Sequence, residues 1–247
     1  MNPYNVTGPT AAEVAQVESI VSQRLKGSFL WMVVGLLTTI GVGFAALVNP
    51  NWLRFAYQNF NIILLVELGV VFLFSARAYS ANVMTLRGMF FLYSALNGLT
   101  LTLVSLRYNV FDVVIPALIG TLAFFVGFAV VGAITKRNLS SLTPYVMAAL
   151  FGMIIVSLVM MGARFFNWTV LSGFSDTVSL VLGYVGVVVF PIFTAIDVNR
   201  IKNNVTQVAL MEDETILDRI EITGALSLYL DFINLFLSLL RIFGNKR

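Results

Sequence analysis

Long apolar segments recur along the whole chain and constrain its fold more than any other feature. A helix of about 20 apolar residues crosses a hydrocarbon core of about 30 Å. Such stretches lie at 28–48, 61–78, 88–106, 111–134, 144–162, 177–197 and 222–243. Inside a bilayer each stretch must satisfy its own backbone hydrogen bonds, so each is predicted to be a helix. We expect an all-α polytopic membrane protein with seven transmembrane helices in one bundle.

Composition supports the membrane assignment and excludes several kinds of site. The chain is 59% hydrophobic and 11% charged, against about 45–50% and about 25% in soluble domains. It has no cysteine, which excludes disulfides, thiolate metal sites and cysteine nucleophiles. It has no histidine, so proton sensing near neutral pH would depend on carboxyl groups. The net charge of +3 is interpreted as loop charge, and no nucleic-acid partner is expected.

The chain divides into a polar N-terminal segment, 1–27, and a transmembrane domain, 28–247. The N-terminal segment carries Val14, Val17, Val21 and Leu25 at near-helical spacing. This pattern predicts a short amphipathic helix on the cytoplasmic membrane surface. Connections between the apolar stretches are short, and the longest expected loop is the charged segment 198–221.

Basic residues predict the orientation, because cytoplasmic loops are enriched in Lys and Arg. The side that holds the N-terminus carries Arg24, Lys26, Arg77, Arg87, Lys136, Arg137, Arg200, Lys202 and Arg219. The opposite side carries Arg54, Arg107 and Arg164. We therefore expect a cytoplasmic N-terminus and, with seven full spans, a C-terminus outside. Arg241, Lys246 and Arg247 favour the alternative, in which one segment is re-entrant and both ends are cytoplasmic.

Asp231 lies in the middle of the last apolar stretch. A carboxylate at mid-bilayer depth costs roughly 2.5–3.5 kcal/mol even on the insertion scale, so it should face a polar interior. Gly224, Ser227, Asn234 and Ser238 share its helical face. This stripe suggests a helix at the centre of a bundle, with Ser227, Asn234 and Ser238 lining a pore. Interhelical hydrogen bonds would explain the serines as well, but they would not explain an aspartate.

Asp197 lies near the end of the preceding stretch, so the two aspartates fall on consecutive antiparallel helices. If they meet in a low-dielectric site, they cannot easily both ionise and should share a proton. Loss of that proton would create repulsion between the helices and shift a two-state bundle. The alternative is that Asp197 is an interfacial residue paired with Arg200.

Two further charged residues belong to the second stretch. Glu67 is deep in the membrane and requires a polar partner. Arg77, at the end of the stretch, would enter the same layer as Asp197 and bridge to it when it is ionised. Snorkelling of Arg77 to the interface is the competing interpretation.

Small residues in the apolar stretches predict close helix packing. They are Gly35, Gly41, Gly43, Gly120, Gly127, Gly183 and Gly186. Pro191 removes a helix hydrogen bond in the sixth stretch, which favours either a kink near a gate or a plain packing bend.

Several of these motifs resemble the Bax inhibitor-1 family. The match is strongest at Ser227-Leu-Tyr-Leu-Asp-Phe-Ile-Asn-Leu-Phe236 and at Leu239-Leu-Arg-Ile-Phe-Gly244. Ala195-Ile-Asp-Val-Asn-Arg-Ile-Lys202, Glu67 and Leu92-Tyr-Ser-Ala-Leu-Asn-Gly-Leu-Thr100 fit as well. The resemblance covers nearly the whole chain from about residue 22, and the short loops look like the bacterial branch.

The resemblance implies seven helices, with the last at the centre of two three-helix layers. It implies a pH-sensitive calcium leak channel of the bacterial inner membrane, with Asp197 and Asp231 as the pH sensor and gate. Arg77 would be the latch, and Glu67 a further charge partner. Calcium wants six to eight oxygen ligands, so binding at Asp197 and Asp231 would be weak and suited to transit. No resident cofactor and no enzymatic activity are expected.

Two alternatives belong to other functional classes. An intramembrane aspartyl protease also pairs two aspartates on consecutive helices, but the Gly-x-Gly-Asp pattern expected of it is missing before Asp231. A non-channel modulator that binds a membrane protease or another membrane complex is suggested by resemblance to bacterial relatives, and the sequence does not test it.

Overall fold

The fold is a bundle of long helices. The computed structural model describes residues 10–165, 168, 174–211 and 213–245. Its longer elements are α1 (Ala11–Val48), α2 (Pro50–Gln58), α3 (Phe60–Arg77), α4 (Val83–Ser105), α5 (Ile115–Ile134), α6 (Thr143–Phe165), α8 (Ser175–Val208) and α9 (Glu214–Gly244). A π-helical turn, Val110–Val114, leads into α5, and a 3-10 turn, Leu139–Leu142, leads into α6. Among the described residues, seven helices are long and apolar enough to cross a membrane. This confirms the all-α polytopic membrane fold.

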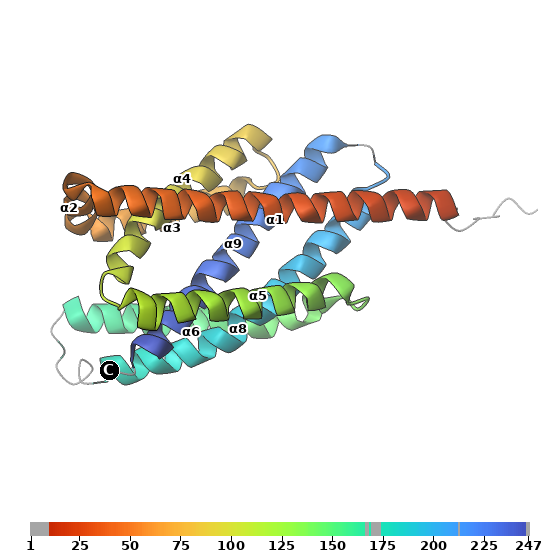
Figure 1. The fold of residues 1–247 in the computed structure, drawn as a ribbon. Helices are drawn as coiled ribbons and strands as arrows, with labels where there is room; N and C mark the ends of the chain where they lie inside the picture. The colour runs from red at the N-terminus through yellow and green to blue at the C-terminus, as the bar shows by residue number, and fades with distance from the viewer. Residues whose placement is uncertain (1–9, 166–167, 169–173, 212, 246–247) are drawn as a thin grey trace, which may run out of the picture.

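Two layers of helices enclose α9 (Figure 1). In one layer α4 packs between α1 and α3, and in the other α8 packs between α5 and α6. α9 crosses obliquely between the layers and contacts α1, α4, α5 and α8. The predicted central position of the last helix is confirmed. α1 begins and α9 ends at opposite ends of the bundle (Figure 1). We call the end where α1 and α9 begin and α8 ends the N-terminal end of the bundle.

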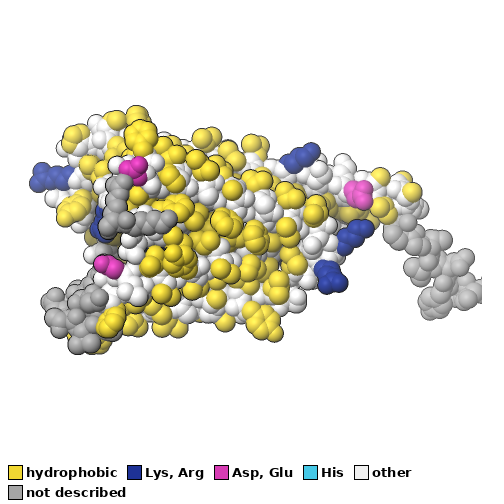
Figure 2. All heavy atoms as spheres, turned by 60° about the horizontal axis from the view of Figure 1, so that its bottom comes forward, with side chains coloured by type: hydrophobic (Ala, Val, Ile, Leu, Met, Phe, Trp, Pro, Cys, Tyr) yellow, Lys and Arg dark blue, Asp and Glu magenta, His cyan; other side chains and the backbone are white. Residues whose placement is uncertain are grey.

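The burial of the helices follows from this arrangement. Tyr229, Leu228 and Leu235 of α9 are fully buried. The peripheral helices instead expose large apolar side chains, such as Phe72 and Ile155, to the surroundings. Figure 2 shows apolar side chains across the middle of one face and charged side chains at its two ends. Lipid is as apolar as these side chains, so such a surface is stable only in a membrane.

The N-terminal segment differs from the expected separate surface helix. α1 begins at Ala11, where Thr10 and Glu13 form a reciprocal capping box, and runs without a break to Val48. Residues 11–27 are therefore a continuation of the first span, and only its first turns project beyond the bundle (Figure 1). Residues 1–9 of that segment lie outside the described residues.

The expected long loop at 198–221 is wrong. α8 continues to Val208 and α9 already begins at Glu214, with Asp213 as its N-cap. The charged residues of this segment made it look like a loop, although apolar residues recur between them. Three of these apolar residues, Ile201, Val205 and Leu217, are buried and keep both helices packed against each other. A helix that keeps burying one face can extend into water while its charges remain on the other face.

Several predicted glycine contacts are confirmed. A methyl group at Gly186 would overlap the Ser238 side chain, and one at Gly43 would press on Thr102. Gly41 and Gly127, in contrast, face open space, so their assignment as packing sites is wrong. The closest backbone approaches involve Gly98 against Thr39 and Gly132 against Ala195, neither of which had been singled out. α8 remains one helix through Pro191.

Candidate functional site

The two aspartates lie on the contact between α8 and α9, the most extensive in the bundle. Asp197 and Asp231 are 7% and 6% exposed. Their carboxyl groups are near enough to repel each other when both are charged. The sequence predicted that the two side chains would meet; the structure places both in the α8–α9 contact, and no hydrogen bond between them occurs among the described residues.

Asp231 has an unsatisfied carboxyl oxygen. Its Oδ2 is buried and has no hydrogen-bond partner among the described residues. Thr194 lies against this carboxyl group, but its hydroxyl donates to the Phe190 carbonyl at 3.0 Å. An ionised carboxylate with too few donors is costly in an apolar interior, and a proton on the group reduces that cost. The geometry therefore suits a carboxyl group that binds a proton.

Asp197 has a different environment. Its Oδ1 accepts a hydrogen bond from Arg200 Nη1 at 2.9 Å, one turn further along α8. The Ser227 side chain of α9 lies against the same carboxyl group. This is the pairing that had been considered as the alternative for Asp197. Because Arg200 belongs to the same helix, the ion pair does not bridge two helices.

A small cavity reaches Asp197 from the N-terminal end of the bundle. Its volume is about 100 Å³, and it is lined mainly by polar groups of α8 and α9. The lining includes Asp197, Arg200, Asn204, Thr223 and Ser227, and Tyr79 from the α3–α4 link. Asp231 does not line this cavity. The cavity therefore gives Asp197, but not Asp231, access to the solvent at that end.

The residues around Asp197 also fasten the neighbouring link between α5 and α6. Asn199 Oδ1 accepts from the Leu139 amide at 2.9 Å, and its Nδ2 donates to the Arg137 carbonyl at 3.2 Å. Lys202 Nζ donates to the Ala133 and Thr135 carbonyls at the end of α5. The sequence did not predict these contacts of Asn199 and Lys202, although both residues belong to the motif 195–202 around Asp197.

The rest of the polar stripe on α9 is not a continuous pore in this structure. Asn234 donates to the Leu230 carbonyl at 2.8 Å, and Ser238 to the Asn234 carbonyl at 2.7 Å. Ser238 is buried in the tight contact with Gly186. Of the three residues predicted to line a pore, only Ser227 borders the cavity at Asp197.

Glu67 lies away from the aspartates, between α3 and α4. It is buried, and its Oε1 accepts a hydrogen bond from Thr100 Oγ1 at 3.0 Å. Glu67 also lies within electrostatic range of the Tyr93 and Tyr229 hydroxyl groups. Tyr229 in turn is 2.6 Å from the Thr39 hydroxyl of α1. The predicted polar partner of Glu67 is thus Thr100, within a second buried polar cluster.

Arg77 is exposed at the end of α3. Among the ion pairs of the described residues, none involves Arg77, and the arginine beside Asp197 is Arg200. The exposed position of Arg77 matches the snorkelling interpretation. The cation paired with Asp197 is Arg200.

The arrangement of acidic side chains bears on cation binding. Among the described residues, no group of three or more acidic side chains lies close enough to hold a metal ion. Two carboxyl groups and a few hydroxyls give fewer oxygens than calcium requires for tight binding. The chemistry available at Asp197 and Asp231 is therefore proton exchange and weak, water-assisted cation contact.

Comparison with known proteins places this geometry in a family. The model of the family described as "Inhibitor of apoptosis-promoting Bax1" matches residues 21–247. The chain belongs to the Bax inhibitor-1 family. An Escherichia coli K12 relative, inner membrane protein YbhL, is 34% identical over 97% of this chain and 98% of its own length. A Borreliella burgdorferi protein is 33% identical over 92% and 94%, and a Streptococcus pyogenes serotype M1 membrane protein is 34% identical over 85% and 90%.

The family match includes both the aspartate pair and the polar cluster around Glu67. The matched region contains α8, α9 and the polar cluster around Glu67, so Bax inhibitor-1 relatives align across every element described above. The resemblance drawn from the motifs of the last two helices is therefore confirmed at the level of the family. No catalytic activity follows from this membership.

Proposed function

We propose that this protein is a pH-sensitive calcium leak channel whose gate is the buried pair Asp197 and Asp231. The observation that carries the proposal is the unsatisfied Asp231 carboxyl beside a second carboxyl that solvent reaches through a small cavity. A buried acidic pair is costly in a membrane, and such groups mark ion and proton paths.

The gating step follows from electrostatics. With one proton shared, the pair carries a single negative charge that Arg200 offsets at Asp197. Loss of that proton places two like charges in a low-dielectric contact and drives the facing segments of α8 and α9 apart. Separation would join the cavity at Asp197 to the stripe that contains Asn234 and Ser238. Calcium would then pass with most of its water shell, because the stripe offers few oxygen ligands.

The proposed setting is the bacterial inner membrane, with a cytoplasmic N-terminus and the C-terminus outside. The Escherichia coli relative is an inner membrane protein, which supports the membrane, and the basic residues at the N-terminal end of the bundle support the orientation. The cavity at Asp197 would then open to the cytoplasm, and the pair would titrate with cytoplasmic pH.

Calcium flux into dye-loaded liposomes tests the proposal directly. The wild-type protein is expected to give a flux that changes with pH, and Asp231→Asn or Asp197→Asn should abolish that change. Asp176→Asn is the matched control, because Asp176 is an exposed aspartate at the opposite end of α8. A pH response that survives in both Asp197→Asn and Asp231→Asn would disprove the assignment.

A second candidate is a non-channel modulator that binds a membrane protease or another membrane complex. A groove of about 660 Å³ between the first turns of α1 and the end of α8 favours it. The groove is lined by the apolar residues Val14, Val17, Val21, Leu25 and Leu210 and by two acidic residues and one basic residue, Glu13, Glu18 and Lys202. Such a surface fits a basic amphipathic helix.

Cross-linking in native membranes separates the two candidates. The modulator predicts a specific cross-linked partner that is lost in Val17→Asp, together with no calcium flux from purified protein. The channel predicts flux from the protein alone, with Val17→Asp and wild type equal.

A further inference from the structure

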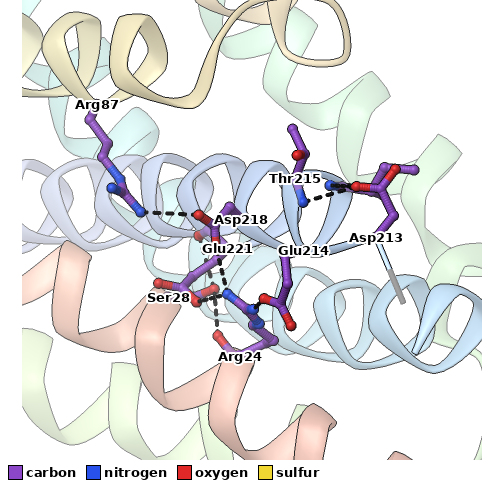
Figure 3. A network of polar contacts seen from close by, with 9 residues as sticks. Arg24, Ser28, Arg87, Asp213, Glu214, Thr215, Asp218 and Glu221 are labelled. Atoms are coloured by element: carbon purple, nitrogen blue, oxygen red, sulfur yellow. Dashed lines mark hydrogen bonds and ion pairs between the residues drawn. The ribbon is translucent and has the colours of Figure 1, made fainter. Parts of the chain in front are cut away.

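A second charged cluster lies at the N-terminal end of the bundle, apart from the aspartate pair. Arg24 of α1 forms ion pairs with three carboxylates on the first two turns of α9 (Figure 3). Its partners are Glu214, Asp218 at 2.5 Å and Glu221 at 3.3 Å. We call Arg24, Arg87, Glu214, Asp218 and Glu221 the arginine clamp.

The clamp joins three helices. Arg87 of α4 approaches the other oxygen of Asp218 at 3.5 Å, from the opposite side (Figure 3). The guanidinium of Arg87 also lies over the Trp31 ring of α1, 5.0 Å from its centroid. Asp218 of α9 is thus paired with arginines of both α1 and α4.

Burial distinguishes this cluster from ordinary surface ion pairs, which contribute little. The Arg24 and Glu221 side chains are 10% and 13% exposed, whereas those of Asp218 and Glu214, nearer the start of α9, are 32% and 77% exposed. A buried guanidinium that loses its partners leaves an uncompensated charge, so the contact is strongly favoured once formed. Packing is adapted to it: Ser28 donates to the Glu221 carbonyl at 3.0 Å, and a methyl group at Gly27 would overlap the Glu221 carboxylate.

Arg219, on the same turns of α9, extends the attachment to the link between α3 and α4. Arg219 Nε donates to the Ala81 carbonyl and its Nη1 to the Tyr79 carbonyl, both at 3.0 Å. Tyr79 lines the cavity that reaches Asp197. The first turns of α9 therefore contact α1, α4 and the α3–α4 link beside that cavity.

We infer that Arg24 is a positioning residue that holds the start of α9 against α1 and α4 and thereby keeps the channel closed at rest. This inference rests on the proposed function. Asp218 and Asp231 are separated by 13 residues of α9, or about 20 Å along the axis. The clamp therefore sets how readily α9 moves, whereas the aspartates determine at which pH it moves.

Distance measurements between spin labels test the clamp without relying on flux. The chain has no cysteine, so Gln23→Cys and Thr215→Cys, at exposed positions of α1 and α9, give unique labels. In lipid nanodiscs, Arg24→Gln should lengthen and broaden the distance distribution, and Arg24→Glu should do so further. Lys26→Gln is the matched control, since it removes the same charge from an exposed position two residues away. A wild-type distribution in both Arg24 variants would overturn the inference.

Calcium flux in liposomes tests the link to gating. Arg24→Gln should raise the resting flux severalfold and leave the midpoint of the pH response unchanged, whereas a purely structural role would lower thermal stability alone. Altered distances with unchanged flux would overturn the gating role. If wild type carries no flux at any pH, the channel proposal fails, and the distance measurement still decides whether the clamp holds α9.

Milder variants keep the test valid if Arg24→Gln does not fold. Glu214→Gln and Asp218→Asn each remove one carboxylate and leave Arg24 paired with the other two. Both should widen the label distance, and Asp218→Asn should do so more, because it also releases Arg87. No widening in either variant would contradict the clamp.

Discussion

Glu67 and Asp231 are both buried carboxyl groups in the membrane, yet their surroundings differ. Glu67 accepts a hydrogen bond from Thr100 of the facing helix. Asp231 lies beside Thr194, whose hydroxyl donates to its own helix, and beside a second carboxyl group. Burial alone does not distinguish them, since they are 8% and 6% exposed. The two groups therefore differ in the donors that face them and in the neighbouring charge.

The largest expected effect separates the two groups by function. Asp231→Asn should abolish the pH response of calcium flux, because the pair can no longer share and release a proton. Glu67→Gln should preserve that response, since Glu67 lies on another helix contact. The measurement is liposome flux across a pH series. An equal loss of the response in both variants would remove the distinction between the two groups.

The next effect concerns stability and uses two threonines. Thr100→Val leaves Glu67 without its hydroxyl donor and should lower the free energy of unfolding by about 1–3 kcal/mol. Thr194→Val removes a hydroxyl that donates to the Phe190 carbonyl of its own helix and should cost less than about 1 kcal/mol. Denaturant titration in detergent measures both. A larger cost for Thr194→Val would mean that this hydroxyl supports Asp231 after all.

A smaller effect is expected at the ion pair of Asp197. Arg200 is about two-fifths exposed, and such pairs contribute roughly 0.2–1 kcal/mol. Arg200→Gln removes the cation that favours ionised Asp197, so the midpoint of the pH response should move to higher pH. The expected change is less than about one pH unit, because 1.4 kcal/mol corresponds to one unit. A flux–pH curve that coincides with wild type would exclude Arg200 as the partner in function.

The smallest effect is expected at Arg77. Its side chain is exposed and makes no ion pair with Asp197 among the described residues, so Arg77→Gln should leave both flux and its pH midpoint unchanged. The same flux assay, run beside Arg200→Gln, measures it. A clear shift in Arg77→Gln alone would restore the latch that the family resemblance implies.

Sequence reasoning succeeded where a residue type has one reasonable environment. An aspartate at the middle of an apolar helix must face inward, and Asp231 does. The sequence did not identify a partner where several residue types could hydrogen-bond to the same buried group. Glu67 required a polar partner, and nothing in the order of residues distinguished Thr100 from a charged group. The arginine clamp was missed because Arg24 resembled an ordinary loop charge that orients the chain.

Boundaries followed the same pattern. Hydropathy located the spans but ended α8 too early and began α9 too late, because Arg200, Lys202 and Asp218 resembled a loop. The buried face of these helices continues beyond the apolar stretches through Ile201, Val205 and Leu217. Charged residues separate these positions in the sequence, so they form no long apolar run.

The sequence by itself determined that the chain spans a membrane with seven helices, and it indicated that the last is central and that Asp231 faces the interior. These follow from the length of apolar runs and the cost of charge in lipid, which depend on local composition. The sequence left Asp197 open between the interior and the membrane interface. Only the tertiary structure decided that Arg200 accompanies Asp197, that Thr100 satisfies Glu67 and that Arg24 joins α1 to α9. Whether two residues far apart in sequence meet depends on how each helix is rotated about its axis and how deep each residue lies in the bundle. The packing of the whole bundle sets both.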